Sequence, residues 1–212
     1  MHIITSDQEA LKLGFGNYTC NWGIHIAGLC ESNKERDEIL FGFFKQGYLD
    51  GNIQLGCLAD RSKEEFKSKF QQFCPECAKD LENPDHFLIQ DAKDFLYPDG
   101  EFSPIKLDRK HNTFYKWVQK SKNKKVRGFS EMEWVLDAMP DKKHLMAYES
   151  RLNYFVRGKP WISLCLYNIN KFDGETIMGV LRTHPYTIIG GIITQNPYYQ
   201  EPDKWLSENA PE

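Results

Sequence analysis

Short apolar runs alternate along this chain with segments that carry a helical pattern. The runs are nearly continuous, which is typical of strands buried on both faces of a parallel sheet. They are Ile24–Leu29, Ile53–Leu58, Phe87–Gln90, Val126–Phe129, Ile162–Tyr167 and Ile188–Thr194. A helix is expected between each pair of successive strands. The sequence therefore predicts an α/β fold of three layers, a mainly parallel sheet of about six or more strands with helices on both faces.

Capping residues and chain breakers mark the ends of the expected helices. Ser32 and Ser62 each precede a glutamate by three residues, the capping-box spacing that satisfies free amides at a helix start. Asp50-Gly51 is a natural end for the first of these helices. Further helices are expected to begin near Ser103-Pro104, Asp141 and Asp173.

The chain contains no internal repeat, low-complexity stretch or long linker that would divide it. We therefore expect a single domain over residues 1–206. Residues 207–212 are expected to form a polar tail or a boundary that leads into an output domain.

Charge and hydropathy exclude several classes of partner. The 27 basic and 30 acidic residues give a net charge of −3 over 212 residues, which lacks the basic excess typical of nucleic-acid-binding proteins. Every apolar run is interrupted within about ten residues, too few to span a membrane. The segment Met1–Ala10 lacks the apolar core of a signal peptide. We expect a cytoplasmic protein with no direct nucleic-acid or membrane contact, whose six cysteines are reduced.

The first strand-to-helix turn, Gly28–Glu35, is where a nucleotide-binding loop would lie. A phosphate loop needs a glycine-rich backbone and a lysine followed by serine or threonine. Here there is one glycine, Lys34 is followed by Glu35, and Glu31 adds a carboxylate that would repel phosphate. No Ser-His-Asp order, metalloprotease motif or dinucleotide fingerprint is visible. We therefore expect a protein that is not an enzyme, with a degenerate relative of nucleotide-binding ATPases as an alternative.

A histidine and a cysteine interrupt two of the apolar runs. His25 lies in the first run and Cys165 in the fifth. Each has a structural explanation, a hydrogen-bonded core imidazole and a buried thiol that packs as a small hydrophobic group. The functional hypotheses are that both contact a small organic ligand, that both bind zinc or iron, or that Cys165 forms an adduct with an aldehyde. Two metal ligands are too few without Glu131, His184 or a cofactor.

Cys74 and Cys77 have the C-x-x-C spacing of zinc and redox sites. A structural zinc site needs about four ligands, and no second pair is present. A redox pair is expected to open a helix after a strand, whereas this pair follows a helical segment. The spacing is therefore interpreted as incidental, with two ordinary thiols.

Residues just after the strands are further candidates, because ligands of open parallel sheets bind at the carboxyl ends of the strands. Glu131 follows the fourth apolar run, which also contains Arg127. An ion pair is the structural alternative for this cluster. His184-Pro185 is interpreted mainly as a helix stop before the last strand.

Several segments together resemble one family, the MEDS domain, the methanogen/methylotroph sensory domain named for a dichloromethane-responsive regulator. In order, they are His25–Glu31 with Glu35–Leu40, Phe95–Phe102, Val126–Trp134, Tyr148-Glu149 with Leu152-Asn153, Leu164–Asn168, His184-Pro185 and Asn196–Tyr199. The resemblance covers Asn21 to Leu206. Cys30 stands where the family commonly has an aromatic residue, and Ser130 where it commonly has glycine, so the identity of the ligand stays open.

The resemblance implies a sensory input domain of a prokaryotic signalling protein with a RecA/KaiC-like fold that lacks the phosphate loop. It also implies a ligand that is a simple hydrocarbon derivative or one-carbon compound, and a characteristic histidine and cysteine that match His25 and Cys165. The expected partners are an output domain or a protein such as a histidine kinase or transcription regulator, and a homodimer is possible. The hypothesis places the ligand among His25, Arg127, Glu131, Tyr148, Cys165 and Tyr167.

Overall fold

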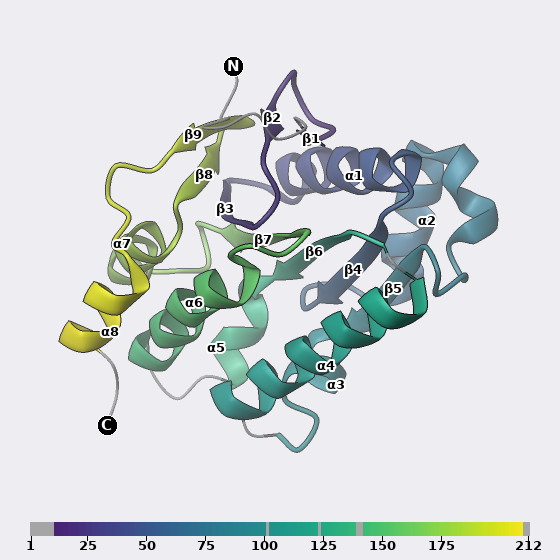
Figure 1. Cartoon of the computed structure of the whole chain (residues 1–212). Coiled ribbons are helices and arrows are strands. Elements are labelled where there is room, and N and C mark those ends of the chain that lie inside the picture. The colour runs from purple at the N-terminus through teal and green to yellow at the C-terminus, as the bar shows by residue number, and fades with distance from the viewer. Residues whose placement is uncertain (1–10, 101, 123, 139–141, 210–212) are drawn as a thin grey trace.

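Seven strands form one sheet at the centre of the molecule (Figure 1). The computed structural model describes residues 11–100, 102–122, 124–138 and 142–209. The strands of the sheet are β3 (Ile24–Cys30), β4 (Ile53–Leu58), β5 (Phe87–Asp91), β6 (Val126–Glu131), β7 (Trp161–Asn168), β8 (Tyr186–Ile189) and β9 (Ile192–Gln195). They lie in the order β5-β4-β6-β7-β3-β8-β9, and every pair is parallel except β8 and β9. The strands β1 (Leu11–Lys12) and β2 (Thr19–Cys20) form a separate antiparallel pair.

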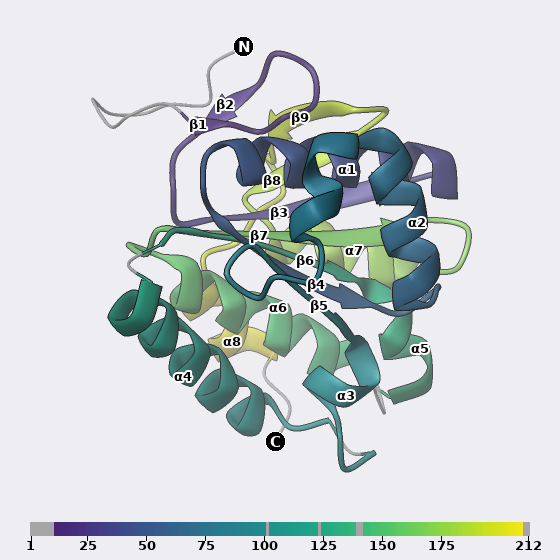
Figure 2. The ribbon, with the colours of Figure 1, turned by 90° about the vertical axis from the view of Figure 1, so that its right-hand side faces the viewer.

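Helices cover both faces of the sheet, as Figure 2 shows. On one face lie α1 (Asn33–Leu49) and α2 (Lys63–Phe73), the latter followed by the 3₁₀ turn Pro75–Asp80. On the other lie α3 (Ala92–Leu96), α4 (Pro104–Lys122), α5 (Val135–Ala138) after the 3₁₀ turn Met132–Trp134, α6 (Lys142–Val156), α7 (Gly174–Thr183) and α8 (Pro202–Asn209). The predicted α/β class with a mainly parallel sheet and helices on both faces is confirmed.

Two helix starts follow the predicted capping chemistry, and the helix expected near Asp173 is also capped by a side chain. The hydroxyls of Ser32 and Ser62 accept hydrogen bonds from the amides of Glu35 and Glu65, and Asp173 accepts one from the amide of Thr176. At α1, the Glu35 carboxylate also accepts from the amide of Glu31, one residue before the N-cap. The predicted start near Asp141 lies outside the described residues, and the helix is described from Lys142.

Successive side chains of a strand point to opposite faces of the sheet, so odd- and even-numbered positions contact different helices. In β3, Ile24 and Ile26 pack into the core under α1 and α2, whereas Ala27 and Leu29 pack into the core under α4 and α6. His25 has the same parity as Ala27, which stands opposite Cys165 of β7 in the sheet register. His25 and Cys165 therefore project from neighbouring strands toward the same layer of helices.

The last predicted strand, Ile188–Thr194, is wrong as a single element. The chain instead forms the hairpin of β8 and β9, joined at Gly190 and Gly191. Both glycines have positive φ, 58° and 71°, a backbone conformation that a two-residue hairpin turn requires. The apolar run hid the turn because isoleucines flank the glycines on both sides.

Two further regions bear on the expectations. Helix α8 extends to Asn209 and buries Trp205 against the core, while the domain bounds at residue 206 stay a prediction. Cys74 and Cys77, expected as thiols, form a disulfide. Residues 1–10, where the sequence predicts no signal peptide, lie outside the described part of the chain. Among the described residues, no helix combines the length and hydropathy that a membrane span needs.

Candidate functional site

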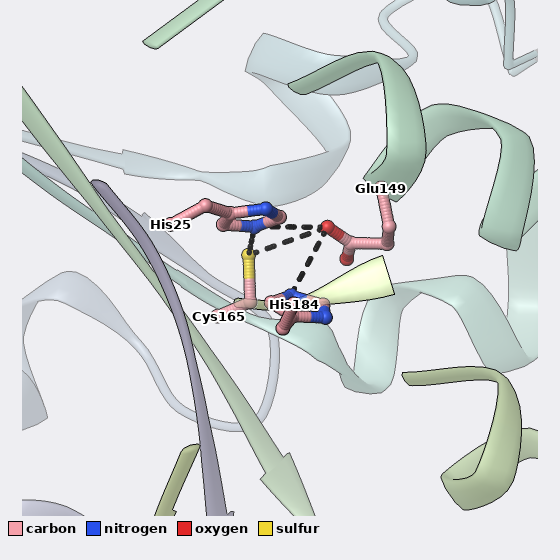
Figure 3. Close-up of side chains that lie close together, drawn as sticks. All are labelled: His25, Glu149, Cys165 and His184. Carbon is pink, nitrogen blue, oxygen red and sulfur yellow. Dashed lines mark hydrogen bonds and ion pairs between the residues drawn. The ribbon is translucent and has the colours of Figure 1, made fainter. Parts of the chain in front are cut away.

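Four buried polar side chains meet beneath α6 (Figure 3). His25 comes from β3, Cys165 from β7, Glu149 from α6, and His184 from the residue that follows α7. The exposed fraction of each residue is 3% or less. One donor atom from each residue lies within 4.8 Å of the others. A polar cluster of this density in a protein interior needs hydrogen bonds, ion pairs or a metal to offset its desolvation.

The carboxylate of Glu149 is the centre of the cluster. Its Oε2 lies 3.2 Å from His25 Nε2, 3.5 Å from His184 Nε2 and 3.6 Å from Cys165 Sγ. His25 Nε2 lies 3.3 Å from Cys165 Sγ. The other carboxylate oxygen, Oε1, accepts a hydrogen bond of 2.6 Å from the Tyr167 hydroxyl. One helix thus contributes the group that links both strands and the segment after α7.

The backbone fixes the orientation of the His184 ring. His184 Nδ1 lies 2.8 Å from the carbonyl oxygen of Val180. Because a carbonyl oxygen only accepts, Nδ1 carries the proton, and in the neutral ring Nε2 presents its lone pair to the cluster. Side-chain amides also hold the backbone at Thr183 and His184. Asn153 donates to the carbonyl of Thr183, and Asn196 donates to the carbonyl of His184.

Burial and the neighbouring charges set the protonation of the cluster. Burial lowers the pKa of His25 to about 4, with the nearby His184 adding to the effect. Burial also raises the pKa of the Cys165 thiol well above its ordinary value, and the Glu149 carboxylate raises it further. Burial would raise the pKa of Glu149, but the imidazoles of His184 and His25, where they carry a positive charge, outweigh it and lower that pKa. The cluster therefore combines a carboxylate with a neutral His25 and a protonated thiol.

A small cavity of about 40 Å³ adjoins the cluster at Cys165. It lies between the sheet and the helices α3, α4 and α6, and its walls are mostly apolar. Residues that line it include Cys57, His111, Tyr148, Leu152, Trp161 and Cys165. Since one water occupies about 10–15 Å³ on such a measure, the cavity has room for a molecule of only a few heavy atoms.

The structure brings four of the six predicted ligand-binding residues together. His25 and Cys165 belong to the cluster, Tyr167 donates to its carboxylate, and Tyr148 lines the adjoining cavity with Cys165. Arg127 and Glu131 do not line the cavity, and they have the opposite parity in β6 from Gly128 and Ser130, which do. The six residues therefore do not line one common pocket.

Arg127 and Glu131 each serve a local structural network. Arg127 is fully buried and donates to Asp50, to Asn52 and to three backbone carbonyls, including that of Phe43 in α1. Glu131 accepts from the amides of Ala59 and Asp60 and pairs with Arg61 at 2.8 Å, as expected of the ion-pair alternative. Glu131 is also at the carboxyl edge of the sheet, beside a polar cleft of about 500 Å³ that contains Asp60 and Arg61.

Sequence reasoning missed Glu149 as a site residue and gave His184 mainly a structural role. Glu149 lies four residues after Leu145 and three before Leu152, both buried, so an acid stands on the apolar face of α6. That pattern was the available signal, because a buried carboxylate needs a specific partner. His184 carried no such signal, since its position depends on where α7 ends.

Comparison with solved structures supports the fold assignment. The uncharacterized protein PH0321 from Pyrococcus horikoshii, solved in complex with an unknown peptide, is similar over 82% of each chain, with a TM-score of 0.60 and 16% identity. The flagellar accessory protein FlaH from Methanocaldococcus jannaschii is similar over 85% of this chain and 83% of its own, with a TM-score of 0.54 and 12% identity. At these identities the likeness is one of fold alone, and it is consistent with the expected RecA/KaiC-like fold.

Comparison with curated protein sequences gave no match. The model of the MEDS family, described as the MEthanogen/methylotroph, DcmR Sensory domain, matches residues 24–185. That range includes every member of the buried cluster and every residue that lines the cavity. The chain belongs to the MEDS family of sensory domains.

Proposed function

We propose that this chain is an input domain of a prokaryotic signalling system and that it binds a small, largely apolar molecule in the cavity beside Cys165. The observation that carries the proposal is that Cys165 belongs both to the cavity wall and to the buried cluster. A molecule in the cavity therefore contacts the cluster directly. One-carbon compounds and other simple hydrocarbon derivatives fit this volume, which is far below the 300–1,000 Å³ of pockets for larger ligands.

Helix α6 is the element that would carry the signal. Tyr148 and Leu152 of α6 line the cavity, while Glu149 between them is the centre of the cluster. A ligand shifts a conformational equilibrium only if it binds the two states with different affinity. Because one helix borders both the cavity and the cluster, a ligand that moves Tyr148 also changes the position of Glu149. An attached output domain, a histidine kinase or a transcription regulator would then respond to that movement.

The start of α1 supports a binding role over nucleotide hydrolysis. The Glu35 amide is already capped by the Ser32 hydroxyl, and the Glu35 carboxylate accepts from the Glu31 amide just before the helix, so a carboxylate already lies at the helix start. A phosphate would have to displace a side chain of its own charge.

A thermal-shift screen tests the proposal with dichloromethane, methanol, formaldehyde and methylamine as probes. A ligand of three heavy atoms binds with a Kd of about 1 mM at best, at roughly 1.5 kcal/mol per atom, so the probes are used at millimolar concentration. At ten times Kd the stabilisation is about 1.4 kcal/mol, or a rise in Tm of roughly 3–6 °C for a domain of this size.

The matched control changes the cavity without touching the cluster. Cys57 lines the cavity from β4 and is not one of the four cluster residues. Cys57→Leu fills the cavity and should abolish the shift, whereas Cys57→Ala leaves space and should retain it. Equal shifts in both variants, or no shift with any probe in the unmodified protein, would contradict the proposal.

A further inference from the structure

Among the described residues, the buried cluster collects the ligand set of a transition-metal site. Two imidazoles, a thiol and a carboxylate are the donors that zinc takes in proteins, whereas calcium and magnesium prefer oxygen donors alone. The four residues come from two strands, a helix and a helix end that are remote in sequence. Their convergence on one point is a property of the fold and not of a local motif.

The distances between the donor atoms match the edges of a tetrahedron around zinc. Bond lengths of about 2.0 Å to nitrogen and oxygen and about 2.3 Å to sulfur place neighbouring donors about 3.3–3.6 Å apart. In the cluster, four separations between donor atoms are 3.2 Å for His25 to Glu149, 3.3 Å for His25 to Cys165, 3.5 Å for His184 to Glu149 and 3.6 Å for Cys165 to Glu149. The remaining pairs of donor atoms lie within 4.8 Å. Small side-chain movements would bring all four donor atoms within bonding distance of one ion.

The His184 ring supplies an independent observation. Its Nδ1 proton is committed to the Val180 carbonyl, so the lone pair of Nε2 points at the Glu149 carboxylate. Nε2 is buried and makes no hydrogen bond. Two electron-rich atoms that face each other in a protein interior repel unless a proton or a metal ion lies between them. A metal ion satisfies His184, Glu149, His25 and Cys165 together, whereas a single proton satisfies one pair.

Neighbouring groups orient two of the four donor side chains by hydrogen bonds. The Val180 carbonyl orients His184, and the Tyr167 hydroxyl holds the second oxygen of Glu149 at 2.6 Å. Metal-binding histidines and carboxylates are usually oriented by hydrogen bonds of this kind. With a thiolate and a carboxylate as the two anionic donors, a divalent ion leaves the site neutral, which suits an apolar interior.

We propose that His25, Glu149, Cys165 and His184 bind one zinc ion. On binding, the thiol of Cys165 loses its proton to solvent and its sulfur forms a bond to zinc. The proposal deepens the proposed sensory function, because Cys165 would place the metal at the wall of the ligand cavity, but it stands on the cluster alone and can hold if no small molecule binds.

Metal analysis of the purified full chain, with any affinity tag removed, tests the site. We expect about one zinc ion per chain, in the protein as isolated or after refolding with Zn²⁺. His184→Gln and Cys165→Ala should each lower the zinc content at least about tenfold. Cys57→Ala is the matched control, because it removes another buried strand thiol that borders the cavity, and it should keep its zinc.

Cobalt substitution identifies the ligands even where a variant is unstable. The cobalt-loaded protein should show the near-ultraviolet thiolate-to-cobalt absorption, which Cys57→Ala retains and Cys165→Ala lacks. Tyr167→Phe keeps all four donors and should weaken zinc affinity about 10- to 100-fold at unchanged stoichiometry. A protein that takes up neither zinc nor cobalt, or one in which His184→Gln and Cys165→Ala bind as the unmodified chain does, overturns the proposal.

The same preparations separate this proposal from the sensory one. Thermal shifts are measured with the small-molecule probes on both zinc-loaded and chelator-treated protein. Ligand binding by a protein that binds no metal would overturn the zinc site alone. A full zinc complement with no response to any probe would overturn the small-molecule function alone.

Discussion

The Tyr167 hydroxyl donates a hydrogen bond of 2.6 Å to the carboxylate of Glu149, and both side chains are buried. The bond joins the centre of the sheet to α6, the helix that borders both the cavity and the cluster. Hydrogen bonds to charged groups contribute more to stability than neutral ones, about 1.5–3 kcal/mol. Tyr167 therefore both positions the carboxylate and fastens α6 to β7.

Tyr167→Phe should lower the free energy of unfolding by about 1.5–3 kcal/mol in metal-free protein, because the buried carboxylate loses its donor. Urea denaturation measures the change. Tyr154→Phe is the control, since Tyr154 also donates to a carboxylate, that of Asp203, but at an exposed site. It should cost less than about 0.5 kcal/mol. Equal losses in the two variants would refute the role assigned to Tyr167.

Arg127→Met should cost about 3–5 kcal/mol, because Asp50, Asn52 and three backbone carbonyls lose a buried donor together. The metal content should not change, since Arg127 lies on the other face of the sheet. Chemical denaturation and metal analysis of the same preparation check both statements. Arg157→Met, at an exposed pair with Glu201, should cost less than about 1 kcal/mol. Loss of zinc from Arg127→Met in a folded protein would place Arg127 in the site after all.

His111 should make the protein sensitive to mild acid. Burial lowers the pKa of His111 to about 4, with Lys110 adding to the effect, whereas an unfolded histidine titrates near about 6.5. Between these two values the unfolded chain binds a proton that the folded chain does not, so stability falls as the pH falls through that window.

His111→Phe should remove that part of the pH dependence while keeping ring contacts with Phe155 and Trp161. Between pH 7.5 and 4.5, the unmodified protein should lose roughly 2–3 kcal/mol more than the variant. Urea denaturation at the two pH values measures both losses. Parallel losses would show that His111 is not held neutral in the folded protein.

The turn of the β8–β9 hairpin should depend on backbone conformation alone. A Cβ at Gly190 or Gly191 would meet no atom within 4 Å, but both residues have positive φ. Gly191→Ala should therefore cost about 1 kcal/mol, and Gly191→Asn less, because asparagine tolerates that conformation better. Thermal denaturation of the two variants compares the costs. A larger cost for asparagine would point to crowding instead of backbone strain.

The order of helices and strands along the chain, and two of the four cluster residues, could be predicted from the sequence. Serine caps and apolar runs are local signals, so the starts of α1 and α2 and the strands β3 to β7 could be predicted. His25 and Cys165 were visible as polar residues inside apolar strands. The order of the strands in the sheet depends on pairing between distant segments, and no local pattern specifies it.

The errors at Arg127 and Glu131 arise from strands that are buried on both faces. Because such a strand shows no alternation, its sequence does not reveal that Arg127 and Glu131 point away from Ser130, which borders the cavity. Glu149 and His184 join the cluster through tertiary packing of α6 and α7 against the sheet. Only the assembled fold brings these two residues to within bonding distance of His25 and Cys165.

The location of a bound one-carbon compound tests the central claim most directly. Crystals exposed to dichloromethane and measured at long wavelength would reveal chlorine by its anomalous scattering, distinct from the known sulfur positions. The account predicts a chlorine peak between Tyr148 and Cys165, in contact with the side chains that line the cavity. It also predicts that the peak disappears in Cys57→Leu. Chlorine bound only at the polar cleft near Arg61, or a peak that persists in Cys57→Leu, would contradict it.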